Sequence, residues 1–299
     1  MTTGPTNWVF LGDSLTEGVG SSRASYVTEL ATLLRRPGAR AVNVVSLRAV
    51  DASTFNPFIP TNLAGFSHLD PQPAAPEELW IWNLASEGKT VENDRDWLPW
   101  LRNLRPARIF IYRGSLESII RPAAVRDGAW PAWVPASWRG FVAMDPRCYF
   151  SAAVHRRAKQ ATIDAVKQRV RLKLLAARPG RPLQDADTVV AHYERLLNGL
   201  RDLGARVHVL GLIPPDRDRF PGSAEHFAML NARVQALTGP PCATFLDWAS
   251  DVEARRGVEP WRYRDGFHPN PAGARLLAEI IRDRLLSDAG EQWQSGSRP

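Results

Sequence analysis

The chain has 299 residues, 44% of them hydrophobic, and carries 38 lysine and arginine residues against 31 aspartate and glutamate residues. Its apolar content is ample for a core. No run approaches the roughly 18 consecutive apolar residues that a membrane span needs, so the composition argues against a membrane-spanning helix. The two cysteines, Cys148 and Cys242, exclude a disulfide framework and a metal-binding cysteine spacing, and we interpret both as core or loop residues.

The N-terminus lacks the features of a secretory signal peptide. It has no charged region followed by a long apolar stretch, and a strand pattern begins by Trp8. We therefore expect a cytoplasmic protein.

The first motif lies at residues 8–18, where an apolar run ends at Gly12. The run at 9–11 predicts a buried strand, and a helical pattern begins at Thr16. A serine at a strand-to-helix turn lies beside backbone N–H groups that have no partner within the helix. Because those groups and the helix dipole favour negative charge, Ser14 has the surroundings that a nucleophilic serine and its oxyanion need.

Helix and strand patterns alternate along the rest of the chain. Sequence patterns predict helices over 26–34, 91–104, 151–177, 187–203 and 224–237, with another beginning near Pro271. Short apolar runs predict strands over 41–47, 79–84, 108–112, 207–212 and 243–246. This alternation predicts an α/β fold in which a parallel sheet has helices on both faces. The loops at the carboxyl ends of the strands then lie together at one edge.

The second motif is Asp265-Gly266-Phe267-His268-Pro269, just before the last predicted helix. A histidine can accept the proton of a serine, and a carboxylate three residues earlier on the same loop can hold the histidine tautomer. We therefore predict a catalytic triad of Ser14, Asp265 and His268.

Together the two motifs resemble those of the SGNH, or GDSL-type, hydrolases. Gly12-Asp13-Ser14-Leu15 is similar to the first block of that family, and Asp265-x-x-His268-Pro269 is similar to its last. The resemblance spans nearly the whole chain and implies a three-layer α/β/α sandwich, flavodoxin-like, around a mostly parallel sheet. It also implies serine acyl-enzyme chemistry with no cofactor. We predict no metal site, because the remaining histidines lack ligand spacing.

The resemblance further implies an oxyanion hole made by the backbone N–H groups of Ser14 and Gly88, although Gly88 is alternatively a plain turn glycine. The third block of the family is Gly-x-Asn-Asp, and its asparagine is the third oxyanion donor. This chain matches the glycine with Gly114, which is a further candidate for the oxyanion hole, but has Leu116 and Glu117 in the last two positions. Leucine donates no hydrogen bond, so either another group replaces the asparagine or the reaction differs from ordinary ester hydrolysis. Candidate replacements are Arg113, Ser115 and Asn83.

We expect one domain over residues 1–286 with two insertions, at about 48–78 and 119–182, and a flexible tail over 287–299. One domain is favoured because the two terminal motifs must meet in space. The first insertion is a candidate substrate rim. The tryptophan- and proline-rich part of the second, 119–150, fits equally a lid over the substrate and a small satellite core.

The positive charge of the chain is concentrated in one segment. Nine basic residues and a single acid lie between His155 and Pro182, and the rest of the chain is close to neutral. On the predicted helix, the apolar face consists of Val154, Ala158, Ala161, Ala165 and Leu172. The basic residues on its flanks indicate either a solvated face or a binding surface for a polyanion. The candidate carrier-binding residues are Arg156, Arg157, Lys167, Arg171 and Lys173.

Three functions fit these features. The first is hydrolysis of a carboxylic ester with a small or lipid-like acyl group. The second is acyl transfer to a small-molecule acceptor from a polyanionic carrier (tRNA, acyl carrier protein or coenzyme A) that docks on the basic helix. The third is a non-catalytic binding module, which the intact Ser14, Asp265 and His268 argue against.

Overall fold

The computed structural model describes residues 6–19, 25–35, 41–46, 78–140, 142–148, 153–240, 243–257 and 260–289. Nearly all of the predicted insertion at 48–78 lies outside these residues, as do Cys242 and the predicted tail beyond Ala289.

In the described residues, a parallel sheet has the strand order β2-β3-β1-β4-β5-β6. Its strands are β1 (Thr6–Gly12), β2 (Val42–Ser46), β3 (Leu79–Asn83), β4 (Arg108–Tyr112), β5 (Arg206–Leu210) and β6 (Thr244–Leu246). The two central strands, β1 and β4, are apolar and almost wholly buried because both faces of the sheet are covered. Phe10 and Phe110 stack across them, with ring centroids 4.4 Å apart.

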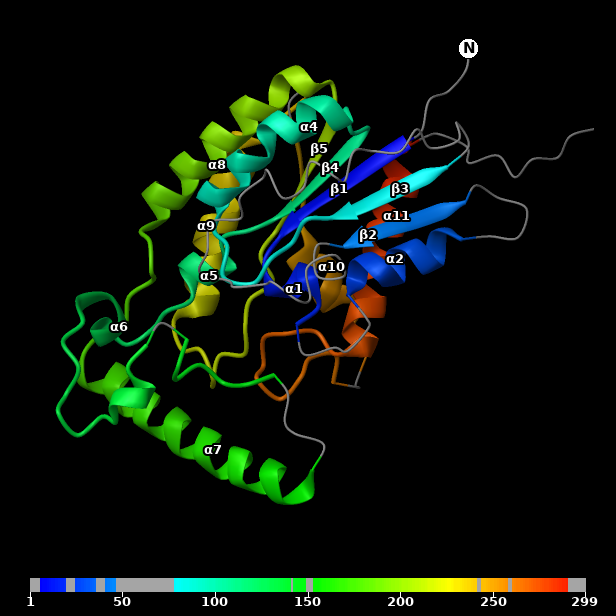
Figure 1. Ribbon diagram of the computed structural model, residues 1–299. Coiled ribbons are helices and arrows are strands. Elements are labelled where there is room, and N and C mark those ends of the chain that lie inside the picture. The colour runs from blue at the N-terminus through cyan, green and yellow to red at the C-terminus, as the bar shows by residue number, and fades with distance from the viewer. Residues whose placement is uncertain are drawn as a thin grey trace, which may run out of the picture.

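Helices cover both faces of the sheet (Figure 1). On one face α2 (Tyr26–Leu34), α10 (Trp248–Arg255) and α11 (Pro271–Ala289) pack together. On the other face α8 (Ala186–Leu200) packs against α9 (Ser223–Leu237) and the 3-10 helix η2 (Val91–Trp97). The remaining helices are α1 (Ser14–Glu17), α4 (Leu98–Leu104), α5 (Ser115–Ser118), α6 (Ala123–Asp127), η3 (Ala136–Trp138), α7 (Val154–Ala177) and η4 (Arg201–Leu203). These layers confirm the predicted α/β/α fold with a parallel sheet.

Several element boundaries differ from the predictions for local reasons. The helix predicted over 91–104 is split into η2 and α4, because Pro99 has no N–H to continue an α-helical ladder through the junction. The last helix runs to Ala289, so it includes the first three residues of the segment 287–299 that we predicted as a tail. In the segments that the structure describes, no helix is both long and apolar enough for a membrane crossing.

The strand order determines where a site can form. Ser14 follows β1, Gly88 follows β3 and Gly114 follows β4, and these three strands are neighbours at the middle of the sheet. Their loops therefore meet at the carboxyl edge, as predicted. The second insertion, with α6 and α7, lies beyond that edge and apart from the two helical layers (Figure 1).

Candidate active site

Ser14 is the first residue of α1, at the turn that follows β1. The Asp13 side chain caps this helix, because its Oδ1 accepts the backbone N–H of Leu15 at 3.0 Å. This contact braces the turn. Gly12 is required by close packing, since a Cβ there would lie 2.0 Å from Thr16 Oγ1. The turn leaves the Ser14 side chain half-buried and open to a substrate.

Asp265 and His268 lie on the loop that leads into α11. Asp265 is 1% exposed, and its Oδ1 accepts the backbone N–H groups of Phe267 at 2.9 Å and His268 at 3.1 Å. Its Oδ2 lies 2.6 Å from His268 Nδ1. Because a carboxylate can only accept there, the proton of a neutral imidazole is held on Nδ1, and Nε2 is left to accept a proton.

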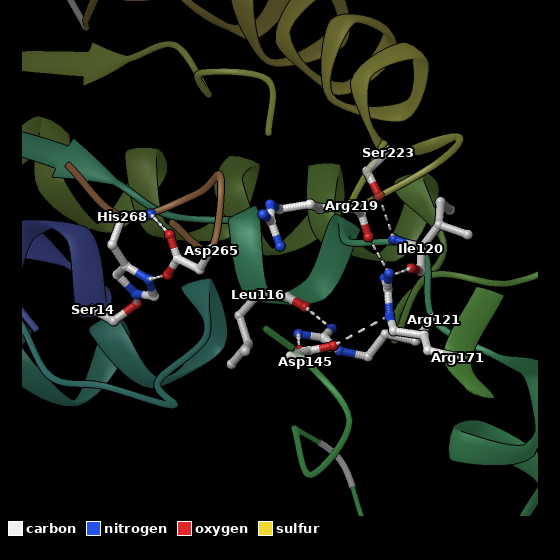
Figure 2. Close-up of polar contacts among 10 residues, drawn as sticks. All are labelled: Ser14, Leu116, Ile120, Arg121, Asp145, Arg171, Arg219, Ser223, Asp265 and His268. Carbon is white, nitrogen blue, oxygen red and sulfur yellow. Dashed lines mark hydrogen bonds and ion pairs between the residues drawn. The ribbon is translucent and has the colours of Figure 1, made fainter. Parts of the chain in front are cut away.

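The third contact joins the two ends of the chain. His268 Nε2 lies 2.8 Å from Ser14 Oγ, although 254 positions separate the two residues (Figure 2). The structure therefore brings together all three residues of the predicted triad, in the order hydroxyl, imidazole and carboxylate. This order allows the imidazole to accept the serine proton and the carboxylate to stabilise the resulting imidazolium.

The other predicted oxyanion residues lie on the turns after β3 and β4. Gly88 is exposed, with a φ of 75°. Gly114 is buried, with a φ of 99°, and precedes α5. The positive φ favours glycine at this position, and a Cβ there would lie in tight contact with Leu230, at 3.2 Å. That the N–H groups of Ser14, Gly88 and Gly114 hold an oxyanion stays a prediction.

None of the three candidate replacements for the missing asparagine has a side chain that faces a substrate. The Arg113 guanidinium binds a buried carboxylate and a backbone carbonyl. The Asn83 amide donates to a backbone carbonyl of α1 at 3.1 Å, and the Ser115 hydroxyl donates to Asp13. All three side chains are buried. These candidates were therefore wrong, because the interior of the protein already uses their donors.

Placing a donor at the half-buried Leu116 is expected to accelerate hydrolysis of simple activated esters. We expect Leu116→Asn to raise kcat/KM for para-nitrophenyl acetate by at least about tenfold, since one oxyanion donor is worth about a hundredfold or more when well placed. Leu116→Ala is the matched control, because it removes the leucine without adding a donor. Equal rates for the two variants would contradict this expectation.

A buried carboxyl group lies beneath the block that contains Leu116. Glu117 is 1% exposed, and its Oε1 accepts the backbone N–H of Val91 at 2.9 Å, which links α5 to the start of η2. Its Oε2 has no hydrogen-bond partner among the described residues. Burial raises the pKa of Glu117 from 4.5 to about 7. The loops after β3 and β4 are thus joined by an acid that titrates near neutral pH.

The raised pKa predicts that ionisation of Glu117 destabilises the fold. Below pH 4.5 the carboxyl is protonated in both the folded and unfolded chains, so it has no effect on the free energy of unfolding. As the pH rises toward 7, the unfolded chain loses this proton first and the folded state is disfavoured. Glu117→Gln should therefore gain about 3 kcal/mol of stability over the wild type between pH 4.5 and pH 8.

Urea unfolding at the two pH values measures this difference. Glu194→Gln, on the exposed side of α8, is the control, and its free energy of unfolding should equal that of the wild type at both pH values. A stability difference between Glu117→Gln and the wild type that does not change with pH would contradict the prediction.

Cys148 lies close to the site, which its position in the sequence does not indicate. This buried cysteine offers a sulfur that lies within 4.8 Å of ligand atoms of Asp265 and His268. Among the described residues, these three form the group whose side chains could hold a metal ion. Asp265 and His268 are hydrogen-bonded to each other in this group, which is the geometry of the triad. No spacing pattern links Cys148 to the later motif, so only the fold could reveal their proximity.

The basic helix α7 is oriented differently from the prediction. Its buried residues are Asp164, Lys167 and Arg171, whereas Val154 and Ala158 on the predicted apolar face are exposed. The predicted apolar contact face is therefore wrong. The reason is that the segments beneath α7 present backbone carbonyls, which attract amine and guanidinium groups rather than methyl groups.

Two of the candidate carrier-binding residues are used inside the protein. Lys167 Nζ donates to the carbonyl of Ala143 at 2.7 Å. Arg171 is fully buried and donates to the carbonyls of Ile120, at 2.9 Å, and Arg219. Neither side chain is placed to contact a carrier. The predicted carrier-binding role is therefore wrong for Lys167 and for Arg171. The other three candidates, Arg156, Arg157 and Lys173, are exposed.

No protein-family model and no curated protein matches this chain. Several solved structures are similar to it. A variant of Axe2, an acetyl-xylooligosaccharide esterase from Geobacillus stearothermophilus, is 14% identical with a TM-score of 0.51, over 98% of each chain. A lipase from a goat rumen metagenome is 13% identical over 93% of this chain and 96% of its own, with a TM-score of 0.49. TesA is 14% identical over 94% of this chain and 98% of its own, with a TM-score of 0.47. The likeness to Axe2 shows that the two chains share the same α/β fold.

Proposed function

We propose that this protein is a serine hydrolase that cleaves a carboxylic ester through a covalent acyl-enzyme. The observation that carries the proposal is the chain of contacts from Ser14 Oγ to His268 Nε2, at 2.8 Å, and from His268 Nδ1 to Asp265 Oδ2, at 2.6 Å. A shared fold with Axe2, an acetyl esterase, agrees with an ester as substrate.

The proposed reaction has two halves. His268 Nε2 takes the proton of Ser14, whose oxygen attacks the ester carbonyl carbon and forms a tetrahedral oxyanion. The backbone N–H groups of Ser14 and Gly88 stabilise that oxyanion, and His268 returns the proton to the departing alcohol. Water, deprotonated by the same imidazole, then releases the acid from Ser14. Asp265 holds the imidazole and stays ionised throughout.

Covalent trapping tests the first half directly. The intact protein is incubated with a fluorophosphonate and with a series of activated acyl donors, and its mass is measured. We expect a single adduct that peptide mapping assigns to Ser14. An adduct on another residue, or none with any reagent, would refute the acyl-enzyme proposal.

A second candidate is acyl transfer from a polyanionic carrier, such as tRNA, acyl carrier protein or coenzyme A, to a small-molecule acceptor. It keeps the same triad and changes only the group that resolves the acyl-enzyme. The observation in its favour is the basic surface that α7 leaves exposed. Its exposed basic residues include Arg156, Arg157, Lys159, Arg169 and Lys173.

If α7 docks a carrier, Arg156→Gln combined with Arg157→Gln should raise the KM for the carrier-bound donor several-fold. The dependence of log KM on log salt should also become shallower, by about one for each phosphate group that the helix no longer binds. The matched control is Arg102→Gln with Arg201→Gln, which removes two exposed charges from other helices. The same salt slope in both double variants would leave ester hydrolysis as the sole proposal.

A further inference from the structure

Beside the triad lies the guanidinium group of Arg219, to which no residue in the described part of the chain is bonded. Arg219 is half-buried, and its guanidinium makes no hydrogen bond or ion pair with the residues that the structure describes. Its stem packs against the triad loop, since a Cβ on Gly266 would lie 3.0 Å from Arg219 Cδ. Figure 2 shows the side chain pointing from its own loop toward Asp265 and His268. The group is therefore directed at the site.

The backbone of Arg219 is held firmly in this place. Its N–H donates to Asp216 Oδ1 at 2.9 Å, so that this oxygen of the acid is bound to the backbone and not to the guanidinium. Its carbonyl accepts from Arg171 and, at 3.2 Å, from Gln168 Nε2, both on α7. The buried polar face of α7 thus fixes Arg219 in advance, which reduces the entropy lost when a ligand binds.

Two further guanidinium groups lie near Arg219 (Figure 2). Arg121 and Arg171, 3% and 0% exposed, share the single carboxylate of Asp145 (Figure 2). Arg121 Nε and Nη2 lie 2.9 Å and 2.8 Å from Asp145 Oδ2, and its Nη1 donates to the carbonyl of Leu116 at 2.8 Å. One carboxylate is therefore matched against two buried guanidinium groups, with the Arg219 guanidinium nearby. The donors of the Arg219 guanidinium, which no described residue engages, can therefore bind an anion.

We propose that Arg219 binds a carboxylate or phosphate group of the substrate while the reacting carbonyl lies at Ser14. This inference rests on the proposed esterase function and defines its substrate class as anionic esters. A planar guanidinium donates two parallel hydrogen bonds to a carboxylate or phosphate, and a half-buried site strengthens them by excluding water. The anionic group belongs to either the acyl part or the alcohol part of the ester.

Two pairs of esters show whether the anionic group belongs to the acyl part or to the alcohol part. Mono-para-nitrophenyl glutarate, compared with its neutral methyl ester, tests a charge on the acyl side. Para-acetoxybenzoate, compared with its methyl ester, tests a charge on the alcohol side. The quantity measured is the ratio of kcat/KM for the charged ester to that for the neutral ester. In one pair we expect Arg219→Met to lower this ratio by about tenfold or more, mainly through KM.

Arg217→Met is the matched control. Arg217 is on the same loop but is exposed and paired with Glu225 at 3.6 Å, so its loss should leave the ratio as in the wild type. Arg219→Lys, which keeps the charge but not the planar fork, should fall between the wild type and Arg219→Met. A ratio that Arg219→Met leaves unchanged in both pairs would overturn the proposal.

A second readout separates this inference from the proposed function. Phenylglyoxal modification of the Ser14→Ala protein is mapped by mass spectrometry with and without monomethyl glutarate and inorganic phosphate. We expect one of these anions to protect Arg219 but not Arg217. If neither anion protects Arg219, the inference is overturned. Protection in a protein that hydrolyses none of the esters supports it and refutes the esterase proposal instead.

Discussion

Replacing Ser14 with alanine is expected to lower kcat for ester hydrolysis by at least about ten-thousand-fold. The hydroxyl is the nucleophile in the proposed reaction, and loss of a triad nucleophile leaves only the rate that the oxyanion site and binding supply. Stability should change by less than about 0.5 kcal/mol, because the hydroxyl is half-buried and, among the described residues, is bonded to His268 alone. Steady-state rates and thermal unfolding measure the two effects.

The triad assignment makes a sharper prediction for the double variant. Ser14→Ala combined with His268→Ala should be no slower than the slower single variant, because the two groups act in one step. Ser287→Ala, at the exposed end of α11, should retain the wild-type rate. A residual rate above about one hundredth of the wild-type rate in Ser14→Ala would rule out this residue as the nucleophile.

The largest expected loss of stability follows removal of Arg113. Its Nε and Nη2 lie 2.8 Å and 2.7 Å from the two oxygens of Asp94, and the side chains are 1% and 0% exposed. Arg113→Met leaves the Asp94 carboxylate buried without its partner, which typically costs about 3–5 kcal/mol. It also removes the bond from Nη1 to the carbonyl of Lys89, at 3.1 Å, beside Gly88. We therefore expect lower activity as well as a lower urea midpoint.

Removing both charges tests the cause of that loss. Arg113→Met combined with Asp94→Leu should be more stable than Arg113→Met alone, because no buried charge is then left unpaired. If the double variant is the less stable of the two, the loss comes from packing and not from the unpaired carboxylate. A cost below about 1 kcal/mol for Arg113→Met would contradict the burial argument itself.

The sequence allowed the fold and the triad to be predicted because their signals are local. A parallel strand buried on both faces needs a continuous apolar run, and such runs mark β1 and β4 directly. The turn at Ser14 needs Gly12 and Asp13 for packing and capping, and the loop before α11 carries both Asp265 and His268. Each residue of the proposed triad therefore lies in a short motif that can be recognised from neighbouring residues alone.

Groups that depend on distant partners were not predictable in this way. Arg113, Ser115 and Asn83 have the right chemistry for an oxyanion donor, yet each is bound elsewhere by a group that the local sequence does not reveal. Similarly, periodicity placed the alanines of α7 toward the protein, whereas Lys167 and Arg171 face it. A helix buries lysine and arginine when carbonyl groups of other segments accept their hydrogen bonds.

The sequence by itself thus determined the class of fold, the alternation of strands and helices, and the three residues of the proposed triad. Only the tertiary structure decided the strand order, the choice of which face of the basic helix is buried, and the position of Arg219 beside the triad. The physical reason is the range of the interactions. Apolar periodicity, capping and turn geometry act within a few residues, whereas burial and hydrogen-bond pairing depend on which distant segments meet.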